Sequence, residues 1–227
     1  MSTIEITLQE NEDHFTKLFS SGYCKPTLRR GIRWNWTSFD EIDIRPCPDG
    51  SSGLAQFKCS SEGKWADYGP NLGSCKSLVI SDLEDGVRRQ ESENELISGL
   101  ARIFKLNPND KFYGGDINGA VAIIRTLTDR LQYRFQTEET SVSRPYTVRK
   151  NYVQEFFQDV IRSVSTLISE EMIDSWIDLD QDRRMNTVSN LLSTLDEGAF
   201  LLADFIDTPE ILEETSSNIG NYIYLLI

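Results

Sequence analysis

The sequence predicts an α+β protein: a small, disulfide-stapled, β-rich module followed by an antiparallel α-helical bundle. All four cysteines of the 227-residue chain lie in its first third, at Cys24, Cys47, Cys59 and Cys75. Glycine and proline are frequent between these cysteines. Beyond Cys75, apolar residues recur instead at the spacing of amphipathic helices. This change of character divides the chain near residue 77.

Composition and charge exclude several classes of protein. The formal net charge is -13, with most of the excess acid in the helical part, and this argues against a nucleic-acid partner. No run of residues approaches the roughly 18 to 20 apolar residues that a transmembrane helix needs. We therefore expect no direct membrane insertion by this chain.

The N-terminal segment, residues 1–22, has neither the basic start nor the apolar stretch of a secretory signal, and we expect it to be disordered or a linker. Disulfides, however, form in oxidising compartments. An internal piece of a longer secreted or membrane protein reconciles the two observations. The alternative is a cytosolic helical scaffold with reduced thiols, and intact-mass measurement before and after reduction distinguishes them.

The cysteine-rich segment is expected to hold two disulfides. It contains no C-x-x-C pair, and the only histidine, His14, lies outside it, so zinc ligation is not expected. About 50 residues rich in glycine and proline cannot bury enough apolar surface to fold without covalent support. Four cysteines allow three pairings, and the residues alone do not choose among them.

Two runs in this module, Glu41–Ile44 and Leu54–Cys59, alternate apolar and polar residues as half-buried strands do. Turn-forming residues lie between them. Trp34 and Trp65 are predicted to belong to the core of the module, packed against the disulfides.

The second part predicts a helical bundle, because apolar stripes recur on segments joined by short loops. Asp116 is the expected N-cap of the second helix, and Trp176, in a short helical turn, is expected to cover the core. The four predicted stripes comprise Leu96, Leu100, Ile103 and Phe104; Ile117, Val121, Ile124, Leu127, Leu131 and Phe135; Val153, Phe156, Phe157, Val160, Ile161, Val164, Leu167 and Ile168; and Met185, Val188, Leu191, Leu192, Leu195, Ala199 and Leu202.

Catalytic, metal and cofactor sites are not expected. The acidic clusters at 82–85, 91–95 and 178–182 lack the ligand spacing of a calcium loop, and we interpret them as solvated helix faces and N-caps. The glycine-containing stretch 113–119 lacks the Gly-Lys-Ser/Thr of a phosphate loop, so we interpret it as a loop and helix start. A single histidine disfavours histidine-dependent catalysis.

The motifs Arg45-Pro-Cys47-Pro, Phe57-Lys-Cys59 and Gly63-Lys-Trp65 resemble the hormone-receptor domain of adhesion G-protein-coupled receptors. Residues 113–121 and 194–204 resemble the latrophilins, in which this domain precedes the helical first half of the autoproteolysis-inducing (GAIN) domain. The resemblance implies a hormone-receptor domain at 23–77 and a helical subdomain at 78–215. Residues 216–227 would begin a truncated β-sandwich or form a divergent tail.

The resemblance also implies a disulfide pairing and a function. The pairing is Cys24 with Cys59 and Cys47 with Cys75. The function is cell-surface recognition and signalling in a full-length receptor, on the extracellular side of the plasma membrane. The expected partners are extracellular protein ligands or adhesion partners and the rest of the receptor, its β-sandwich and seven-helix domain. A soluble secreted binding protein or decoy built from the same modules is the alternative.

Three further expectations concern the surface and the chemistry of the chain. Asn35-Trp36-Thr37 is a sequon for N-glycosylation at Asn35. The candidate contact residues are the aromatic side chains expected at the surface, namely Tyr23, Trp36, Phe39 and Tyr68. The His-Leu-Ser/Thr cleavage motif of the resembling family is missing, so we expect no self-cleavage, and a single band on a denaturing gel of purified protein tests this.

Overall fold

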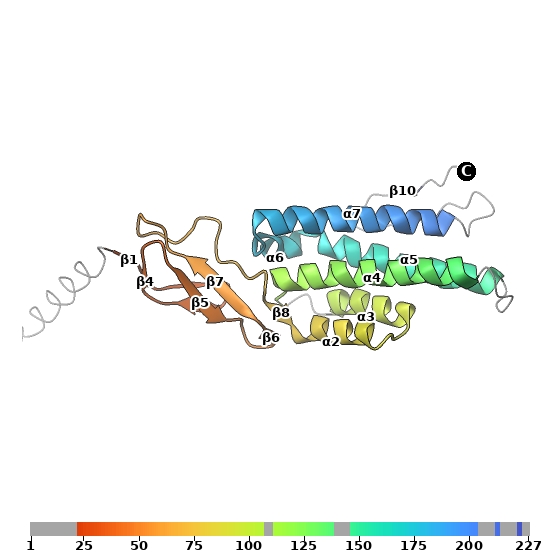
Figure 1. Cartoon of the computed structure of the whole chain (residues 1–227), viewed down its shortest axis with the longest axis horizontal. Helices are drawn as coiled ribbons and strands as arrows, with labels where there is room; N and C mark the ends of the chain where they lie inside the picture. Colours follow the sequence, from red (N-terminus) through yellow and green to blue (C-terminus); the bar gives the residue numbers. More distant parts are fainter. Residues whose placement is uncertain (1–21, 107–110, 139–145, 204–211, 214–221, 224–227) are drawn as a thin grey trace, which may run out of the picture.

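The computed structural model describes residues 22–106, 111–138, 146–203, 212–213 and 222–223. A β-rich module and a helical bundle lie end to end along the long axis of the molecule (Figure 1). The predicted α+β class is therefore confirmed. The expectations for residues 1–22 and 216–227 fall almost wholly outside the described residues. The only strand pair described beyond the bundle joins β9 (Leu212–Glu213) to β10 (Tyr222–Ile223).

Short antiparallel strand pairs form the β-rich module. They pair β1 with β4, β2 with β3, β5 with β7, and β6 with β8. The expected strands at 41–44 and 54–59 correspond to β5 and β7. The bounds are β1 Tyr23–Cys24, β2 Thr27–Arg29, β3 Ile32–Trp34, β4 Thr37–Ser38, β5 Ile42–Pro46, β6 Ser51–Ser52, β7 Leu54–Lys58 and β8 Lys76–Ser77.

Two disulfides hold these short strands together, joining Cys24 to Cys59 and Cys47 to Cys75 with Cα–Cα distances of 5.7 and 5.5 Å. This is the pairing that the resemblance implied. The core beside them is aromatic: the fully buried Trp34 meets Phe57 edge to face at 5.3 Å, and Phe57 stacks on Trp65 at 4.6 Å. Trp65 itself is only half-buried. Covalent links and aromatic packing together replace a large apolar core.

Strand β5 alternates as expected, but its apolar side chains face solvent. Ile42 and Ile44 are 50% and 53% exposed, whereas Asp43 and Arg45 are partly covered. The register explains this, because Asp43 and Arg45 lie opposite the buried Phe57 and Ala55 of β7. Successive side chains of a strand point to opposite faces, so the two isoleucines must point outward. The Asp43–Arg45 ion pair, 2.9 Å long, keeps both charges paired on the covered side.

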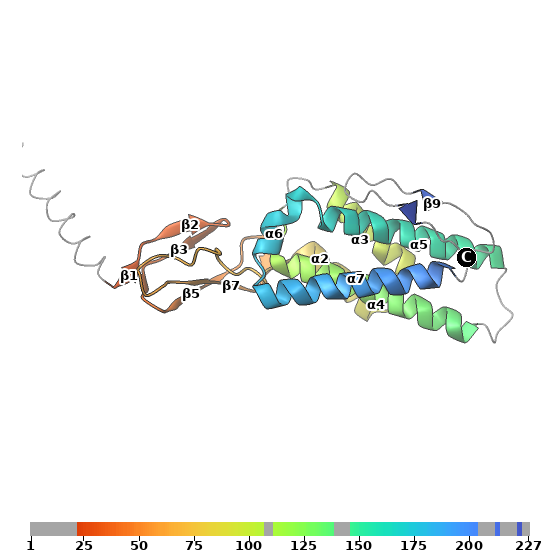
Figure 2. The same cartoon turned by 90° about the horizontal axis from the view of Figure 1, so that it is seen from above.

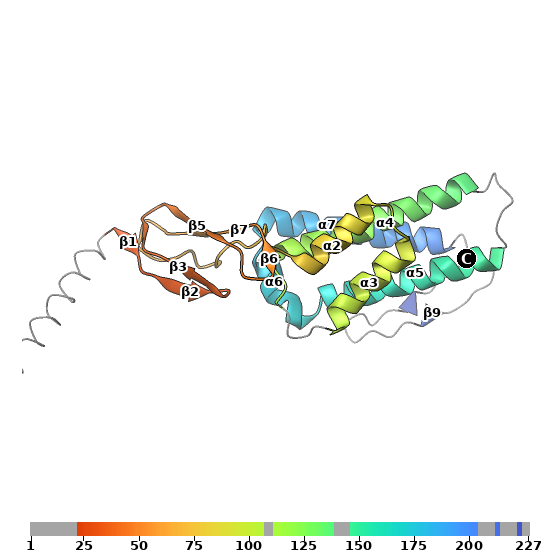
Figure 3. The ribbon, with the colours of Figure 1, turned by 90° about the horizontal axis from the view of Figure 1, so that it is seen from below.

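The bundle has two layers, one of long helices and one of shorter helices. The long helices α4, α5 and α7 alternate in direction, so α4 and α7 run parallel and both begin beside the β-rich module (Figures 1 and 2). The shorter α2 and α3 pack beneath α4 and α5 (Figure 3). The bounds are α2 Leu78–Arg88, α3 Glu93–Leu106, α4 Gly114–Glu138, α5 Tyr146–Leu167, η1 Glu170–Met172, α6 Ile173–Ile177 and α7 Gln181–Ala203.

The predicted apolar stripes of α3, α4 and α5 form the core of the bundle, except that Ile103 of α3 and two residues of the α5 stripe are not fully buried. All six predicted residues of α4, from Ile117 to Phe135, are buried. Ile161 is only partly covered, and Ile168 is exposed because it lies one residue past the end of the helix. Trp176 packs against the core and donates its indole N–H to Leu167 O at 2.7 Å. Helix α2 was not predicted, because acidic residues obscure its short apolar stripe.

The stripe predicted for α7 was wrong in part, because Met185, Val188 and Leu192 are exposed. Small or polar residues take their place on the buried face, which comprises Thr187, Leu191, Thr194, Gly198, Leu201 and Leu202. The helix packs closely there: a Cβ at Gly198 would lie 2.2 Å from the ring of Phe157. Small side chains permit this close approach. The predicted Leu191 and Leu202 are buried, but apolar periodicity alone did not identify Thr187, Thr194 and Gly198 as part of the buried face.

Candidate functional site

The site that distinguishes this molecule is the joint between the β-rich module and the helical bundle. It begins at the two-residue turn between β2 and β3, where Arg30 and Gly31 both have positive φ, 54° and 76°. Such a turn matches the twist of a hairpin, but its first position favours Asn, Asp or Gly. An arginine there costs on the order of 1 kcal/mol in backbone strain.

The side chain of Arg30 explains why this strained turn is kept, since it reaches across the joint into the bundle. Its Nε and Nη2 donate to the two carboxylate oxygens of Asp178 at 2.8 and 2.6 Å. Nη2 also donates to Phe112 O at 3.0 Å, and Nη1 reaches Asp174 at 3.4 Å. The guanidinium group lies 5.6 Å from the ring centre of Tyr113. This two-pronged geometry is specific to arginine.

Asp178 is the centre of the joint, and its side chain is only 2% exposed. Besides Arg30, its carboxylate accepts a hydrogen bond from Gly114 N at 3.3 Å, and its main-chain oxygen accepts one from Leu72 N at 3.1 Å. One residue between α6 and α7 thus binds two separate segments of the β-rich module and the first residue of α4. A buried carboxylate needs partners of this kind to offset its lost hydration.

A second carboxylate, that of Asp116, binds the covalent connection between the two units. Its Oδ1 accepts hydrogen bonds from Ser77 N and Ser77 Oγ, both at 2.7 Å, and its Oδ2 accepts one from Tyr113 N at 2.8 Å. The expected role as N-cap of α4 was therefore wrong, since Asp116 lies in the first turn of the helix. Beside it, Lys76 Nζ pairs with Glu84 of α2 at 2.6 Å.

Main chain also meets main chain at the joint. A Cβ built on Gly115 would lie 2.2 Å from the carbonyl oxygen of Cys75, and one on Gly114 would lie 3.0 Å from Gly73 Cα. Tyr113 meanwhile joins the apolar core of the β-rich module, together with Trp34 and Leu72. The first turn of α4 therefore packs directly against the disulfide-linked end of the module.

Burial controls the ionisation of both carboxylates. Burial raises the pKa of Asp178 to about 6, although the hydrogen bonds and positive charge of Arg30 oppose the shift. Burial also raises the pKa of Asp116, against the hydrogen bonds from Ser77 and Tyr113. Each group is thus held by its partners in an environment that would otherwise favour the neutral acid.

The raised pKa of Asp178 predicts a pH dependence of stability. The folded state binds a proton at Asp178 more tightly than the unfolded state does, so its contribution to the free energy of unfolding increases as the pH falls from about 7 through about 6 toward 4. Urea unfolding should show that, as the pH falls over this range, the free energy of unfolding of the native chain increases relative to that of Asp178→Asn. If the free energy of unfolding of the native chain instead increased relative to the variant as the pH rises, Arg30 would outweigh burial and the pKa of Asp178 would lie below its ordinary value.

The acidic clusters, interpreted from sequence as solvated faces and caps, contain two buried ionic contacts. One is Asp178. The other is Glu93 of α3, which is 5% exposed and pairs with Arg134 of α4 while accepting a hydrogen bond from the Tyr152 hydroxyl at 3.1 Å. The capping interpretation holds at Asp180, whose carboxylate accepts Arg183 N at 2.9 Å at the start of α7. The spacing of acidic residues in the sequence could not distinguish the buried, ion-paired carboxylates from the capping one.

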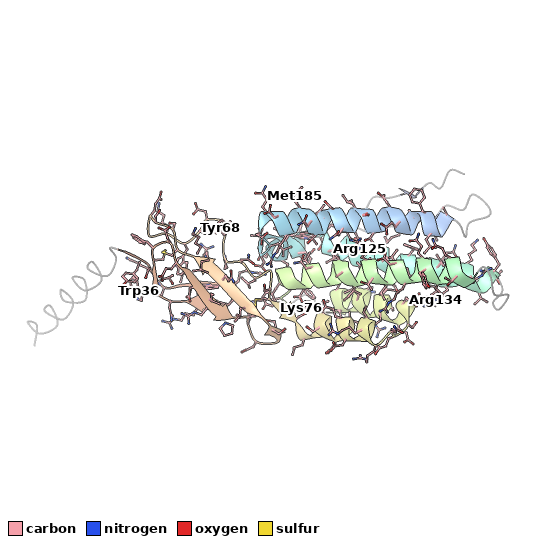
Figure 4. The ribbon with its side chains drawn as sticks, in the orientation of Figure 1. Trp36, Tyr68, Lys76, Arg125, Arg134 and Met185 are labelled. Atoms are coloured by element: carbon pink, nitrogen blue, oxygen red, sulfur yellow. A yellow bond between two sulfur atoms is a disulfide. The ribbon has the colours of Figure 1, made fainter. Side chains whose placement is uncertain are left out.

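The other predicted site residues lie away from the joint. Asn35 is exposed between β3 and β4. Of the four aromatic candidates, Tyr23, Trp36 and Tyr68 are exposed, whereas Phe39 is partly covered and lies against Gly63. Trp36 and Tyr68 extend from the surface of the β-rich module, and Lys76 marks the joint (Figure 4). Sequence reasoning missed both the β2–β3 hairpin and Arg30, for which the Arg30-Gly31 pair was the available signal of a turn.

The described part of the chain contains neither a metal-binding cluster nor a membrane-spanning helix. No group of three or more His, Cys, Asp or Glu side chains in this part of the chain is arranged to hold a metal ion. Within the same ranges, no helix combines the length and the apolar character that crossing a bilayer requires.

The structure thus consists of two units, a disulfide-stapled module and a helical bundle, joined through the Arg30–Asp178 ion pair and its neighbouring contacts. Comparison with known proteins agrees: residues 21–78 match the model of the hormone receptor domain, and residues 79–203 match that of the AGRL2-4 GAIN subdomain A. The chain belongs to the latrophilin-like adhesion G-protein-coupled receptors.

Individual relatives support the same assignment. The chain is 30% identical over 195 residues to Adhesion G protein-coupled receptor L1 of mouse and of human. It is 25% identical over 249 residues to Latrophilin Cirl of Drosophila persimilis. These alignments cover 82% and 86% of the chain but only 13% and 14% of the relatives. The chain thus spans about one seventh of the length of the curated relatives it matches.

Proposed function

We propose that the chain acts in cell-surface recognition on the extracellular side of the plasma membrane, as one rigid unit of a latrophilin-like receptor. The hormone receptor domain would contact an extracellular protein partner, and the helical bundle would connect it to the rest of the receptor. The joint is the observation that carries this proposal. Its ion pairs, hydrogen bonds and main-chain contacts fix the orientation of one unit on the other.

The charge arrangement at the joint supports a role in positioning. Asp178 is buried and Arg30 is largely covered, and such pairs contribute less net stability than their number of contacts suggests, because both groups lose hydration. They do, however, fix the relative orientation of the two side chains, since a planar guanidinium donates two hydrogen bonds to a carboxylate only over a narrow range of orientations. A flexible tether between the two units would need none of these contacts. The same proposal assigns signal transmission to the full-length receptor and no catalysis to this piece.

The test combines a binding measurement with an orientation measurement. The full chain, produced with its disulfides intact and displayed as a dimeric fusion, should bind the surface of cells saturably. Small-angle scattering of the native chain should fit a single end-to-end arrangement of the two units. Gly115→Ala places a methyl group against Cys75 O, so its scattering should require a wider range of orientations between the units. No saturable binding to any cell type tested, or scattering that requires freely moving units, would contradict the proposal.

A further inference from the structure

We propose that Asn35 carries an N-linked glycan, placed at the end of the hormone receptor domain away from the joint. Asn35-Trp36-Thr37 is the only N-x-Ser/Thr triplet in the sequence, and its middle residue is not proline. The two disulfides call for the same oxidising secretory route in which asparagine is glycosylated. In this respect the inference rests on the proposed extracellular location.

The structure leaves the acceptor group free while holding the main chain around it. Asn35 N donates to Asp43 Oδ2 at 2.9 Å, and Asn35 O accepts the hydroxyl of Thr37 at 3.1 Å. The side-chain amide makes no hydrogen bond to any other described residue, and Asn35 is exposed. A sugar attached to this amide therefore displaces no native contact.

The other two residues of the triplet show how the site is presented. Thr37 is 8% exposed and pairs with Cys24 across β1 and β4, so its side chain has a structural role as well. Trp36 is 42% exposed and lies at the end of the β-rich module that faces away from the bundle (Figure 4). A large hydrophilic group at Asn35 is thus directed into solvent, far from Arg30 and the contacts of the joint.

The chemistry needs one co-reactant, a lipid-linked oligosaccharide diphosphate. The amide nitrogen of Asn35 forms a bond to the first carbon of the sugar, while the bond from that carbon to the diphosphate oxygen breaks. The lipid diphosphate leaves with the bonding electrons, and the amide nitrogen loses one proton to a base. The transfer takes place while the chain is still extended, so the later burial of Thr37 does not block it.

The experiment produces the full chain behind a secretion signal in a eukaryotic cell and measures its intact mass before and after peptide-N-glycosidase. We expect the mass of one glycan, its complete loss on treatment, and conversion of Asn35 to aspartate. Asn35→Gln should remove the glycan. Thr37→Ser keeps both the acceptor triplet and a hydroxyl at this position, so it should retain the glycan and separates loss of the site from a failure to fold.

A matched control is Asn186→Gln, which changes another exposed asparagine outside any acceptor triplet and should leave the glycan in place. A secreted, disulfide-bonded native chain with the mass of the bare polypeptide would overturn the proposal. So would a glycan that persists in Asn35→Gln. Either result leaves the proposed receptor role intact, because cell-surface binding is measured separately.

Discussion

Replacing Arg30 with alanine is expected to lower the free energy of unfolding by about 3 kcal/mol, because it leaves the carboxylate of Asp178 buried without its cation. The side chain of Asp178 is 2% exposed and cannot recover its hydration without opening the joint. The pKa of Asp178 should rise further above its already elevated position, since the group that opposes the shift is gone. Urea unfolding near pH 7.5 and carboxylate NMR titration measure the two effects.

Two further substitutions make this result specific. Arg33→Ala removes an exposed arginine from β3 of the same hairpin and should change the stability little. Arg30→Lys keeps the charge but loses the two-pronged geometry, so it should fall between the native chain and the alanine variant. Equal effects of Arg30→Ala and Arg33→Ala would show that the joint does not depend on the Arg30–Asp178 pair.

Removing the Cys47–Cys75 disulfide with a Cys47→Ala, Cys75→Ala double variant should destabilise the hormone receptor domain by about 4 kcal/mol. The bond closes a loop with a sequence separation of 28 residues, and the loss follows from the entropy that the unfolded loop regains. The small module has little apolar core with which to offset such a loss. Limited proteolysis should cut the module rapidly while the far-ultraviolet circular dichroism of the helices persists.

The Cys24–Cys59 disulfide provides the comparison for this prediction. It closes a slightly longer loop, with a separation of 35 residues, and its removal should destabilise the module to a similar extent. Only Cys75, however, has its carbonyl oxygen packed against Gly115 of α4. Loss of the Cys47–Cys75 bond should therefore also loosen the joint, and equal hydrogen-exchange protection of α4 in both double variants would argue against this coupling.

Local patterns in the sequence predicted most of the fold. Helical periodicity identified the buried faces of α3, α4 and α5, because large apolar residues there pack against one another. It was only partly right on α7, where Thr187, Thr194 and Gly198 share the buried face with leucines and the apolar Met185 is exposed. Where a helix packs closely through small residues, a threonine or glycine can lie in the contact while a larger apolar side chain lies outside it.

The joint was beyond prediction from local patterns for a related reason. Asp178 lies in an acidic run that looks solvated, and Arg30 lies in a polar turn; only the folded arrangement brings the two residues together. The two residues are 148 positions apart, so an analysis of neighbouring residues cannot detect their contact. What the sequence did contain was an arginine at a turn position that normally favours Asn, Asp or Gly, and this conflict marks the residue as one with a role elsewhere.

That separation of 148 positions also sets an order of events during synthesis. At about 5 to 20 residues per second, Arg30 is added to the chain roughly 7 to 30 seconds before Asp178. The hormone receptor domain can therefore begin to fold and oxidise its thiols while the surface that will receive Arg30 is still being translated. The joint cannot close until translation has passed Asp178, just before the start of α7.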